Sequence, residues 1–221
     1  MNHKLLALGG DGIGPEVLES GLSILEAISK KNKINFEISF DLIGGTCWDK
    51  YGTFCRNSTI EKAIESDAIL VGAVGGPKWD AMKIKGDPEE QDGLMCLRKK
   101  LGAFFGIRPA KNYKSLQNVI PFNKEYVQNS KIIILREMCG GVMFSKPRGL
   151  KFLENGKRYG FDTAGYNEFE IRKFAKCGFE LAKMYNKTII SIDKSNVMES
   201  YSLCRDVVQE VSNDYTRINL E

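Results

Sequence analysis

Histidine is nearly absent from this 221-residue sequence, which contains only His3. A Ser-His-Asp triad, a Cys-His pair and an H-E-x-x-H zinc site each need a histidine held inside a fold. We expect His3 to lie in a frayed terminal segment, where it cannot serve any of them. These chemistries are therefore excluded, and any proton transfer must use lysine, tyrosine, aspartate or glutamate.

Other features are missing as well. The six cysteines form no C-x-x-C pair, which predicts reduced thiols in a cytoplasmic protein. No apolar run reaches the roughly 18 residues of a membrane span, and no signal peptide is recognisable. The 32 basic and 28 acidic residues are interspersed, with a net charge of +4 and no long basic run. The sequence therefore gives no support for binding to nucleic acid or to a membrane.

The order of the predicted elements indicates the fold class. Hydrophobic residues make up 43% of the chain and charged residues 27%, as in a globular protein with one or two cores. Helices are predicted after Pro15 and Asn57 and at 92–101, 168–185 and 198–211; strands are predicted at 4–8, 34–40, 68–74, 104–107, 131–136 and 188–192. This alternation predicts an α/β fold with a largely parallel sheet and flanking helices, divided into domains 1–107 and 108–221.

The segments between these elements are less regular. We predict a loop at 82–91, hairpins or an arm at 142–160, and the beginning of a further strand at Ile218 and Leu220.

Two glycine-rich turns follow predicted strands. The first, Gly9 to Glu16, leads into a helix whose first turn suits Pro15, and such a strand–turn–helix can bind negative charge. It does not fit the G-x-G-x-x-G dinucleotide fingerprint, because Pro15 stands where a glycine is needed. A purely structural turn is the alternative. The second turn, Gly75 to Asp80, follows an apolar strand at the edge of the sheet where ligands of α/β proteins collect.

Three arginines lie in unusually apolar surroundings. Arg98 is on a predicted helix, whereas Arg108 and Arg136 each end an apolar, strand-like run. A guanidinium fixed at a strand end offers rigid, paired donors to a carboxylate or phosphate. The three residues predict a pocket for a small, multiply anionic molecule. The alternative is that they are ordinary surface arginines or members of salt bridges.

Several blocks of sequence, taken together, resemble the β-decarboxylating isocitrate/isopropylmalate dehydrogenase family. They occur in the family's order and extend over the whole chain: residues 10–16, residues 72–80, Leu97-Arg98-Lys99, Ile107-Arg108-Pro109-Ala110, Arg136-Glu137-x-x-Gly140-Gly141 and Asp193-Lys194-x-Asn196-Val197. The blocks around Trp79 and Arg98 are most similar to those of the 3-isopropylmalate members. The resemblance implies the family's two-domain fold.

The resemblance also implies a reaction and a set of site residues. A secondary alcohol is oxidised by hydride transfer to NAD, and the product loses carbon dioxide with the help of Mg²⁺ or Mn²⁺. By resemblance, a small dicarboxylate is held by Arg98, Arg108 and Arg136, and Lys194 is the general base. The cofactor is contacted by Ile13, Gly75 and Gly76. Members of the family are homodimers, and residues 142–160 resemble their intersubunit arm. Without the resemblance, the alternative interpretation of Lys194 is a solvated lysine that follows an aspartate at a strand end.

The sequence departs from the family at three points. Met143 stands where the family has a tyrosine that protonates the enol, and a thioether cannot donate a proton. Tyr159, Tyr201 or a water molecule are candidate substitutes. Gln91 occupies an acidic position near the substrate. The metal-binding aspartates and most of the adenosine-binding loop have no counterpart here, so the resemblance implies a C-terminally truncated fold, no metal site within this chain, and an uncovered sheet edge.

These observations lead to three hypotheses. The first is NAD-dependent oxidative decarboxylation of 3-isopropylmalate in leucine biosynthesis, with this chain as a fragment that is inactive alone. The second is a non-catalytic remnant or binding subunit that keeps the anion pocket. The third is a sibling activity on isocitrate, tartrate or homoisocitrate.

Overall fold

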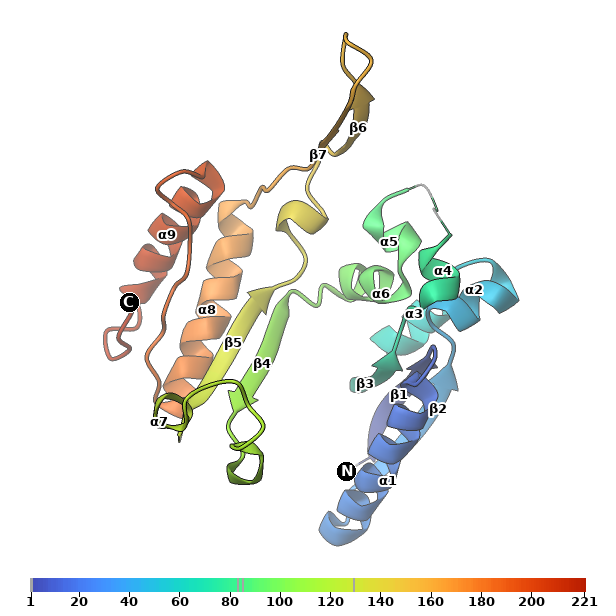
Figure 1. Ribbon diagram of the computed structural model, residues 1–221. Helices are drawn as coiled ribbons and strands as arrows, with labels where there is room; N and C mark the ends of the chain where they lie inside the picture. The colour runs from blue at the N-terminus through green and yellow to red at the C-terminus, as the bar shows by residue number, and fades with distance from the viewer. Residues whose placement is uncertain (1, 83, 85, 129) are drawn as a thin grey trace. The chain divides into compact units, whose positions relative to one another are not determined.

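The computed structural model describes residues 2–82, 84, 86–128 and 130–221, which form a mixed α/β fold (Figure 1). Its compact units are Met1–Ala103 and Phe104–Glu221. The elements of the first unit are β1 (Asn2–Gly10), α1 (Gly14–Asn32), β2 (Asn35–Asp41), α2 (Gly45–Tyr51), α3 (Asn57–Ile64), β3 (Ala68–Ala73), α4 (Pro77–Asp80), α5 (Pro88–Gln91) and α6 (Gly93–Leu101). Those of the second unit are β4 (Phe105–Lys111), η1 (Lys114–Leu116), α7 (Lys124–Val127), β5 (Lys131–Glu137), η2 (Gly141–Met143), β6 (Gly149–Phe152), β7 (Arg158–Phe161), α8 (Glu168–Tyr185) and α9 (Glu199–Ser212).

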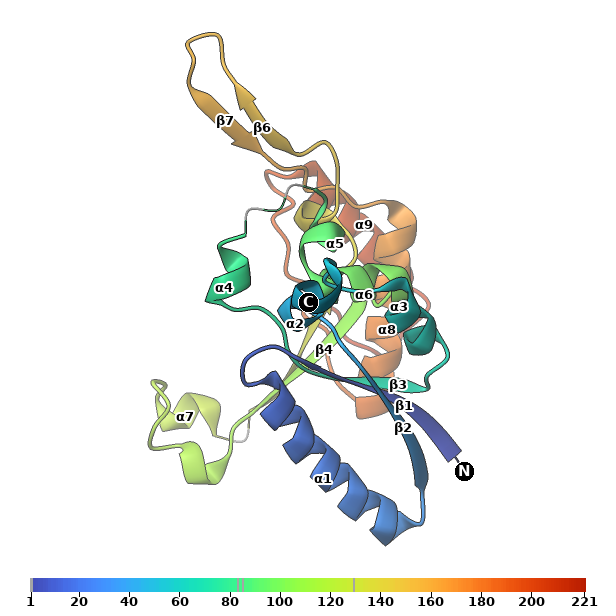
Figure 2. The same cartoon turned by 90° about the vertical axis from the view of Figure 1, so that its right-hand side faces the viewer.

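The first unit is built on a parallel sheet with the strand order β2-β1-β3. Side chains of the central strand β1 alternate between the two faces of the sheet. Leu6 and Leu8 pack with Ile43, Ala63 and Leu97 in one buried cluster. The other face is covered by α1, which runs along the sheet on the side opposite α3 and α6 (Figure 2). The predicted parallel sheet with flanking helices is therefore confirmed in this unit.

Strand β3 occupies a different place from the one its sequence predicts. Its apolar run is typical of a strand buried on both sides, yet within the described residues β3 pairs only with β1 and forms an edge of the sheet. Its residues from Ile69 to Ala73 are half-buried. Apolar side chains of α1 are exposed as well, among them Val17, Ile24 and Ile28. The sheet therefore has an edge and an apolar surface that these residues leave open.

The first helix approaches β3 closely because glycines line the contact. A Cβ atom on Gly14 would lie 2.2 Å from the carbonyl oxygen of Gly9, and one on Gly72 would lie 2.2 Å from the carbonyl oxygen of Gly14. Both distances are far below van der Waals contact. The first glycine-rich turn is therefore held directly against the backbone of β3.

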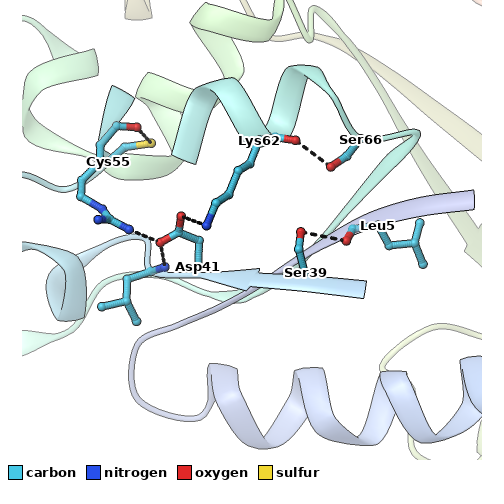
Figure 3. A network of polar contacts seen from close by, with 8 residues as sticks. Leu5, Ser39, Asp41, Cys55, Lys62 and Ser66 are labelled. Carbon is cyan, nitrogen blue, oxygen red and sulfur yellow. Dashed lines mark hydrogen bonds and ion pairs between the residues drawn. The ribbon is translucent and has the colours of Figure 1, made fainter. Parts of the chain in front are cut away.

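A buried carboxylate joins the end of β2 to α3 (Figure 3). The side chain of Asp41 is 3% exposed and accepts hydrogen bonds from Arg56, from Lys62 Nζ at 3.0 Å and from the backbone N–H of Leu42 at 2.8 Å. Burial by itself raises the pKa of Asp41, but the Leu42 N–H and the two cations outweigh it, so the pKa is lowered overall. The charged form is thus stabilised where the strand ends.

The second unit places helices on one face of an antiparallel strand pair. Strands β4 and β5 pair along their length, from Phe105 with Glu137 to Lys111 with Lys131. Helix α8 lies against them: the rings of Phe105 and Phe174 are 5.2 Å apart, and a Cβ on Gly178 would lie 3.3 Å from Leu135. On its other side α8 packs on α9 through a core that contains Ala175, Phe179 and Val211.

This unit adds an antiparallel strand pair to the largely parallel sheet that the sequence predicts. A parallel pair needs a crossover, usually a helix of several turns. The segment between β4 and β5 contains only η1 and the short α7, so the pair is antiparallel. The strand predicted at 188–192 is reduced to one parallel bridge between Ile189 and Leu220, the latter within the predicted C-terminal strand. The hairpin predicted within 142–160 is formed by β6 and β7, ends one residue later at Phe161, and stands away from the rest of the unit (Figure 1).

Two smaller differences concern boundaries. The sequence divides the domains between residues 107 and 108, which would cut β4, whereas the compact units meet between Ala103 and Phe104 and keep the strand whole. The predicted loop at 82–91 ends in a helical turn, α5, with a capping box between Asp87 and Glu90; its residues 83 and 85 lie outside the described ones. None of the described helices is both long and apolar enough to cross a membrane.

Candidate functional site

Two of the predicted anion-binding arginines lie on one face of the β4–β5 pair. Gly106 is opposite Arg136, and Arg108 is opposite Ile134. Directly opposed residues point to the same side, so Arg108 and Arg136 are diagonal neighbours, at a typical separation of about 7–8 Å. Leu135, which alternates with them, packs on α8. The two guanidinium groups therefore project from the face that α8 does not cover.

The positions of these arginines along their strands correct the sequence prediction. Arg136 is the penultimate residue of β5, close to the predicted strand end. Arg108 lies in the middle of β4, because the strand continues through Pro109 to Lys111. Proline is tolerated there because it can face away from the paired edge. The shared face, rather than a shared strand end, brings the two side chains together.

The charges of both arginines are uncompensated within the described part of the chain. Both side chains are exposed, and neither forms an ion pair there. Arg136 Nη2 lies 3.6 Å from the sulfur of Met143, a weak and neutral acceptor. A pair of exposed guanidinium groups with no carboxylate partner is suited to binding a multiply anionic molecule.

A tyrosine that the sequence reading missed lies beside the turn that leads to Met143. Glu137 accepts hydrogen bonds from the backbone N–H groups of Cys139 at 2.7 Å and Gly140 at 2.9 Å, which shapes this turn. The ring of Tyr166 fills the space next to it, since a Cβ on Gly141 would lie 2.1 Å from the Tyr166 hydroxyl. Burial, with a smaller effect of Glu137, raises the pKa of Tyr166. No sequence motif pointed to it.

Tyr159 and Tyr201, the candidate substitutes for the family tyrosine that Met143 replaces, lie on other elements. Tyr159 is on the β6–β7 hairpin, where its ring stacks on Phe161 at 5.9 Å. Tyr201 is on α9, close enough to Tyr166 to affect its pKa. The phenol in contact with the Gly140–Gly141 turn is that of Tyr166.

Lys194 lies in an exposed loop that is held to α9 by hydrogen bonds. Its carbonyl oxygen accepts the N–H groups of Val197 and Met198, both at 3.2 Å. The preceding Asp193 receives two hydrogen bonds of 2.9 Å from Arg205, through Nε and Nη2, and one from the N–H of Ser195. Among the described residues no hydrogen bond or ion pair is formed by the Lys194 ammonium, so no contact shows where it acts. The role of Lys194 as general base therefore stays a prediction.

The hydrogen bonds between Arg205 and Asp193, next to Lys194, predict that the stability of the fold decreases at low pH. Arg205, and to a smaller extent the Ser195 N–H, lower the pKa of Asp193 to about 2, against about 3.9 in an unfolded chain. A carboxyl whose folded pKa is depressed stabilises the fold above its unfolded pKa, and this stabilisation is lost as the pH falls from about 4 to about 2. In denaturant titrations, we expect the unfolding free energy of Asp193→Asn and of Arg205→Gln to decrease less steeply over that pH range than that of the parent chain. An unchanged acid slope in both variants would refute the assignment.

The remaining predicted residues belong to the first unit. Arg98 lies on α6, half-buried, with Nη1 3.4 Å from the sulfur of Met95. Ile13 is the N-cap of α1 and is 58% exposed. Gly75 and Gly76 follow β3, and Gly75 is exposed with φ at +101°. Because β1 and β3 are parallel neighbours, the turns after them lie at the same edge of the sheet, as expected for a ligand site.

Two further groups are relevant to this site. The exposed Gln91 donates a hydrogen bond to the carbonyl of Gly86 across the short helix α5. The described residues contain no group of three or more His, Cys, Asp or Glu side chains placed to hold a metal ion. By themselves they do not fit Mg²⁺ or Mn²⁺, whose ligands the family resemblance implies outside this chain.

Comparisons with known proteins agree with this fold. The model of the family described as isocitrate/isopropylmalate dehydrogenase matches residues 4–221. Curated relatives named 3-isopropylmalate dehydrogenase, from Pseudomonas fluorescens and Xanthomonas euvesicatoria, are each 43% identical over 220 residues. The alignments cover all of this chain, which spans 61% of the length of those relatives.

Solved structures resemble the chain over nearly its whole length. Isocitrate dehydrogenase from Methylococcus capsulatus has a TM-score of 0.81 at 17% identity, covering 99% of this chain and 59% of that one. A β-decarboxylating dehydrogenase from Thermococcus kodakarensis has a TM-score of 0.71 at 22% identity, covering 99% and 57%. These likenesses establish the fold. With the family match over almost every residue, they show that this chain belongs to the isocitrate/isopropylmalate dehydrogenase family.

Proposed function

We propose that this chain is part of an NAD-dependent dehydrogenase that oxidises and decarboxylates 3-isopropylmalate in leucine biosynthesis. The observation that carries the proposal is the identity of 41–43% to relatives named 3-isopropylmalate dehydrogenase over the full chain. The arginine pair on β4 and β5 supports it, because a malate derivative offers two carboxylates and each guanidinium presents paired donors to a carboxylate.

The substrate carboxylates are assigned to the arginines. Arg108 and Arg136 present their donors from one sheet face and bind the dicarboxylate by charge-assisted hydrogen bonds. Arg98 is proposed as a third contact. Lys194 removes the proton of the substrate hydroxyl, and neighbouring positive charge stabilises the oxygen as negative charge develops on it.

The cofactor contacts are assigned to the turns after β1 and β3. NAD, when bound, accepts the hydride. Ile13 offers an exposed apolar side chain, and a Cβ on the adjacent Gly12 would meet no atom within 4 Å. A Cβ on Gly75 would meet only Asp80 Oδ1, at 3.9 Å, so this glycine allows a close approach of a planar ring to the backbone, whereas the space at Gly76 is taken by the ring of Trp79 at 3.3 Å. The described residues thus fit the nicotinamide half of the cofactor. A metal ion has no fitting ligand set among them, so no step is assigned to it.

We propose a homodimer as the functional assembly of the whole protein. The β6–β7 hairpin is an isolated pair of short strands, which is marginally stable alone in water. Leu150 and Phe152 on β6 are exposed, as expected for an arm that packs against another subunit.

A second candidate is a non-catalytic binding subunit. It is favoured by Met143, which cannot donate a proton, and by the lack of a metal-binding group in the described residues. A sibling activity on isocitrate, tartrate or homoisocitrate would use the same arginines.

The catalytic proposal is tested by turnover and binding in parallel. With 3-isopropylmalate, NAD and Mg²⁺, the 221-residue chain should produce no NADH, because its described residues offer no fitting metal ligands. It should still bind 3-isopropylmalate in a calorimetric or NMR titration, more tightly than a monocarboxylate of the same size. The Pseudomonas fluorescens relative is the positive control. NADH formation that is lost in Lys194→Ala would contradict the expected inactivity, and absence of binding would contradict the site.

A further inference from the structure

Asp11 is a buried carboxylate to which the catalytic proposal assigns no role. It is 1% exposed and lies in the first glycine-rich turn. Its Oδ2 accepts the backbone N–H groups of Gly45 and Gly75, both at 2.8 Å, and its Oδ1 accepts that of Thr46 at 2.7 Å. Its own N–H donates to the carbonyl of Ala73 at 2.6 Å. One side chain therefore connects the turns after β1 and β3 with the beginning of α2.

The charge of Asp11 is balanced by backbone groups. Within the part of the chain that the structure describes, Asp11 forms no ion pair with a lysine or arginine. Burying an unpaired carboxylate is costly, and three N–H donors offset that cost. Because these N–H groups already point at Asp11, the amides of Gly45, Thr46 and Gly75 are not available to a phosphate of the cofactor.

The space around the carboxylate is closed. A Cβ on Gly44 would lie 2.3 Å from Asp11 Oδ2, and Gly44 has φ at +79°. On the other side, Thr46 Oγ1 donates to the carbonyl oxygens of Gly10 and Ile43 at 3.2 Å. A methyl group at position 44 would therefore force the carboxylate, and the amides bonded to it, to shift.

We propose that Asp11 is a positioning residue, which fixes the turn that carries Ile13 relative to the turn that carries Gly75 and Gly76. Its carboxylate is buried and does not touch the cofactor; it acts through the backbone of the two turns. The inference rests on the proposed function, because these turns are the assigned nicotinamide contacts. The buried aspartate thus sets the spacing of the surface on which that ring would lie.

The test compares Asp11→Asn with a core variant of equal burial. Asparagine has the same shape, but its NH₂ group meets an N–H donor instead of accepting it. In amide NMR spectra of the full 221-residue chain, we expect displaced signals for Gly45, Thr46 and Gly75, extending to Ile13 and Gly76. Leu8→Ala removes a buried side chain from the preceding strand, β1, and should lower stability without moving these signals.

A second variant serves if Asp11→Asn does not fold. Gly44→Ala keeps the carboxylate but places a methyl group against it, so the same signals should move. Nicotinamide mononucleotide is the binding probe, and we expect about a tenfold weaker affinity in the displaced variant, which corresponds to about 1.4 kcal/mol. Unmoved Gly75 and Ile13 signals, or displaced turns with unchanged affinity, would overturn the positioning role. Absence of probe binding to the unmodified chain would instead count against the proposed cofactor contacts.

Discussion

Replacing Arg136 with alanine is expected to raise the dissociation constant for 3-isopropylmalate roughly 10- to 100-fold. A hydrogen bond to a charged group contributes about 1.5–3 kcal/mol, and each 1.4 kcal/mol changes affinity tenfold. Among the described residues, the sulfur of Met143 is the one polar side-chain partner of the Arg136 guanidinium, so little is lost when the guanidinium turns to a carboxylate. Isothermal titration calorimetry on the 221-residue chain measures the effect.

Three further variants make this result specific. Arg136→Lys keeps the charge but loses the paired donors of the guanidinium, so its affinity should lie between those of the parent and the alanine variant. Arg108→Ala should weaken binding in the same direction, because Arg108 projects from the same sheet face. Arg158→Ala removes an exposed charge from the hairpin and should leave binding unchanged. If Arg136→Ala binds as tightly as the parent chain, the dicarboxylate site is wrongly assigned.

The elements that the sequence predicts well are those with local signals. Helix α8 was predicted at 168–185 and occupies those residues, because its apolar positions recur with the helical period and Asn167 forms a capping box with Glu170. Strand β1 is likewise predicted by its short apolar run. The end of the following turn is predicted by Pro15, whose fixed φ suits the first turn of a helix. Such signals need no knowledge of the rest of the chain.

Features that depend on distant contacts were not predictable in this way. An apolar run does not specify whether its strand is central, so β3 reads as buried although it forms an edge among the described residues. Strand direction depends on the connection, so the prediction of a largely parallel sheet does not specify the antiparallel pair of β4 and β5. For the site, the residue types of Arg108 and Arg136 were predicted, but their shared face follows from the register. Asp11 lies in a recognised block, but its backbone donors come from other turns, and the contact of Tyr166 with Gly141 likewise follows only from the fold.

The core of the second unit should be sensitive to one residue. Phe179 is 1% exposed, packs with Val211 and stacks on Tyr215 at 4.9 Å between ring centroids. Removing a buried phenylalanine costs about 3–5 kcal/mol, from lost burial and from the cavity left behind. We expect Phe179→Ala to lower the unfolding free energy by that amount in urea or guanidinium titrations. On the same helix, Phe169 is 73% exposed, and Phe169→Ala should change stability by less than about 0.5 kcal/mol.

This stability prediction also separates folding from binding. Helix α8 carries Phe179 on the side facing α9 and contacts β5 through Gly178 and Leu135, so it supports the strand that bears Arg136. Phe179→Ala should reduce dicarboxylate binding only in proportion to the unfolded fraction, and a ligand excess should restore the folded state. Arg136→Ala should weaken binding at unchanged stability, because its side chain is exposed. A loss of stability in Arg136→Ala equal to that in Phe179→Ala would mean that the arginine supports the fold instead of the substrate.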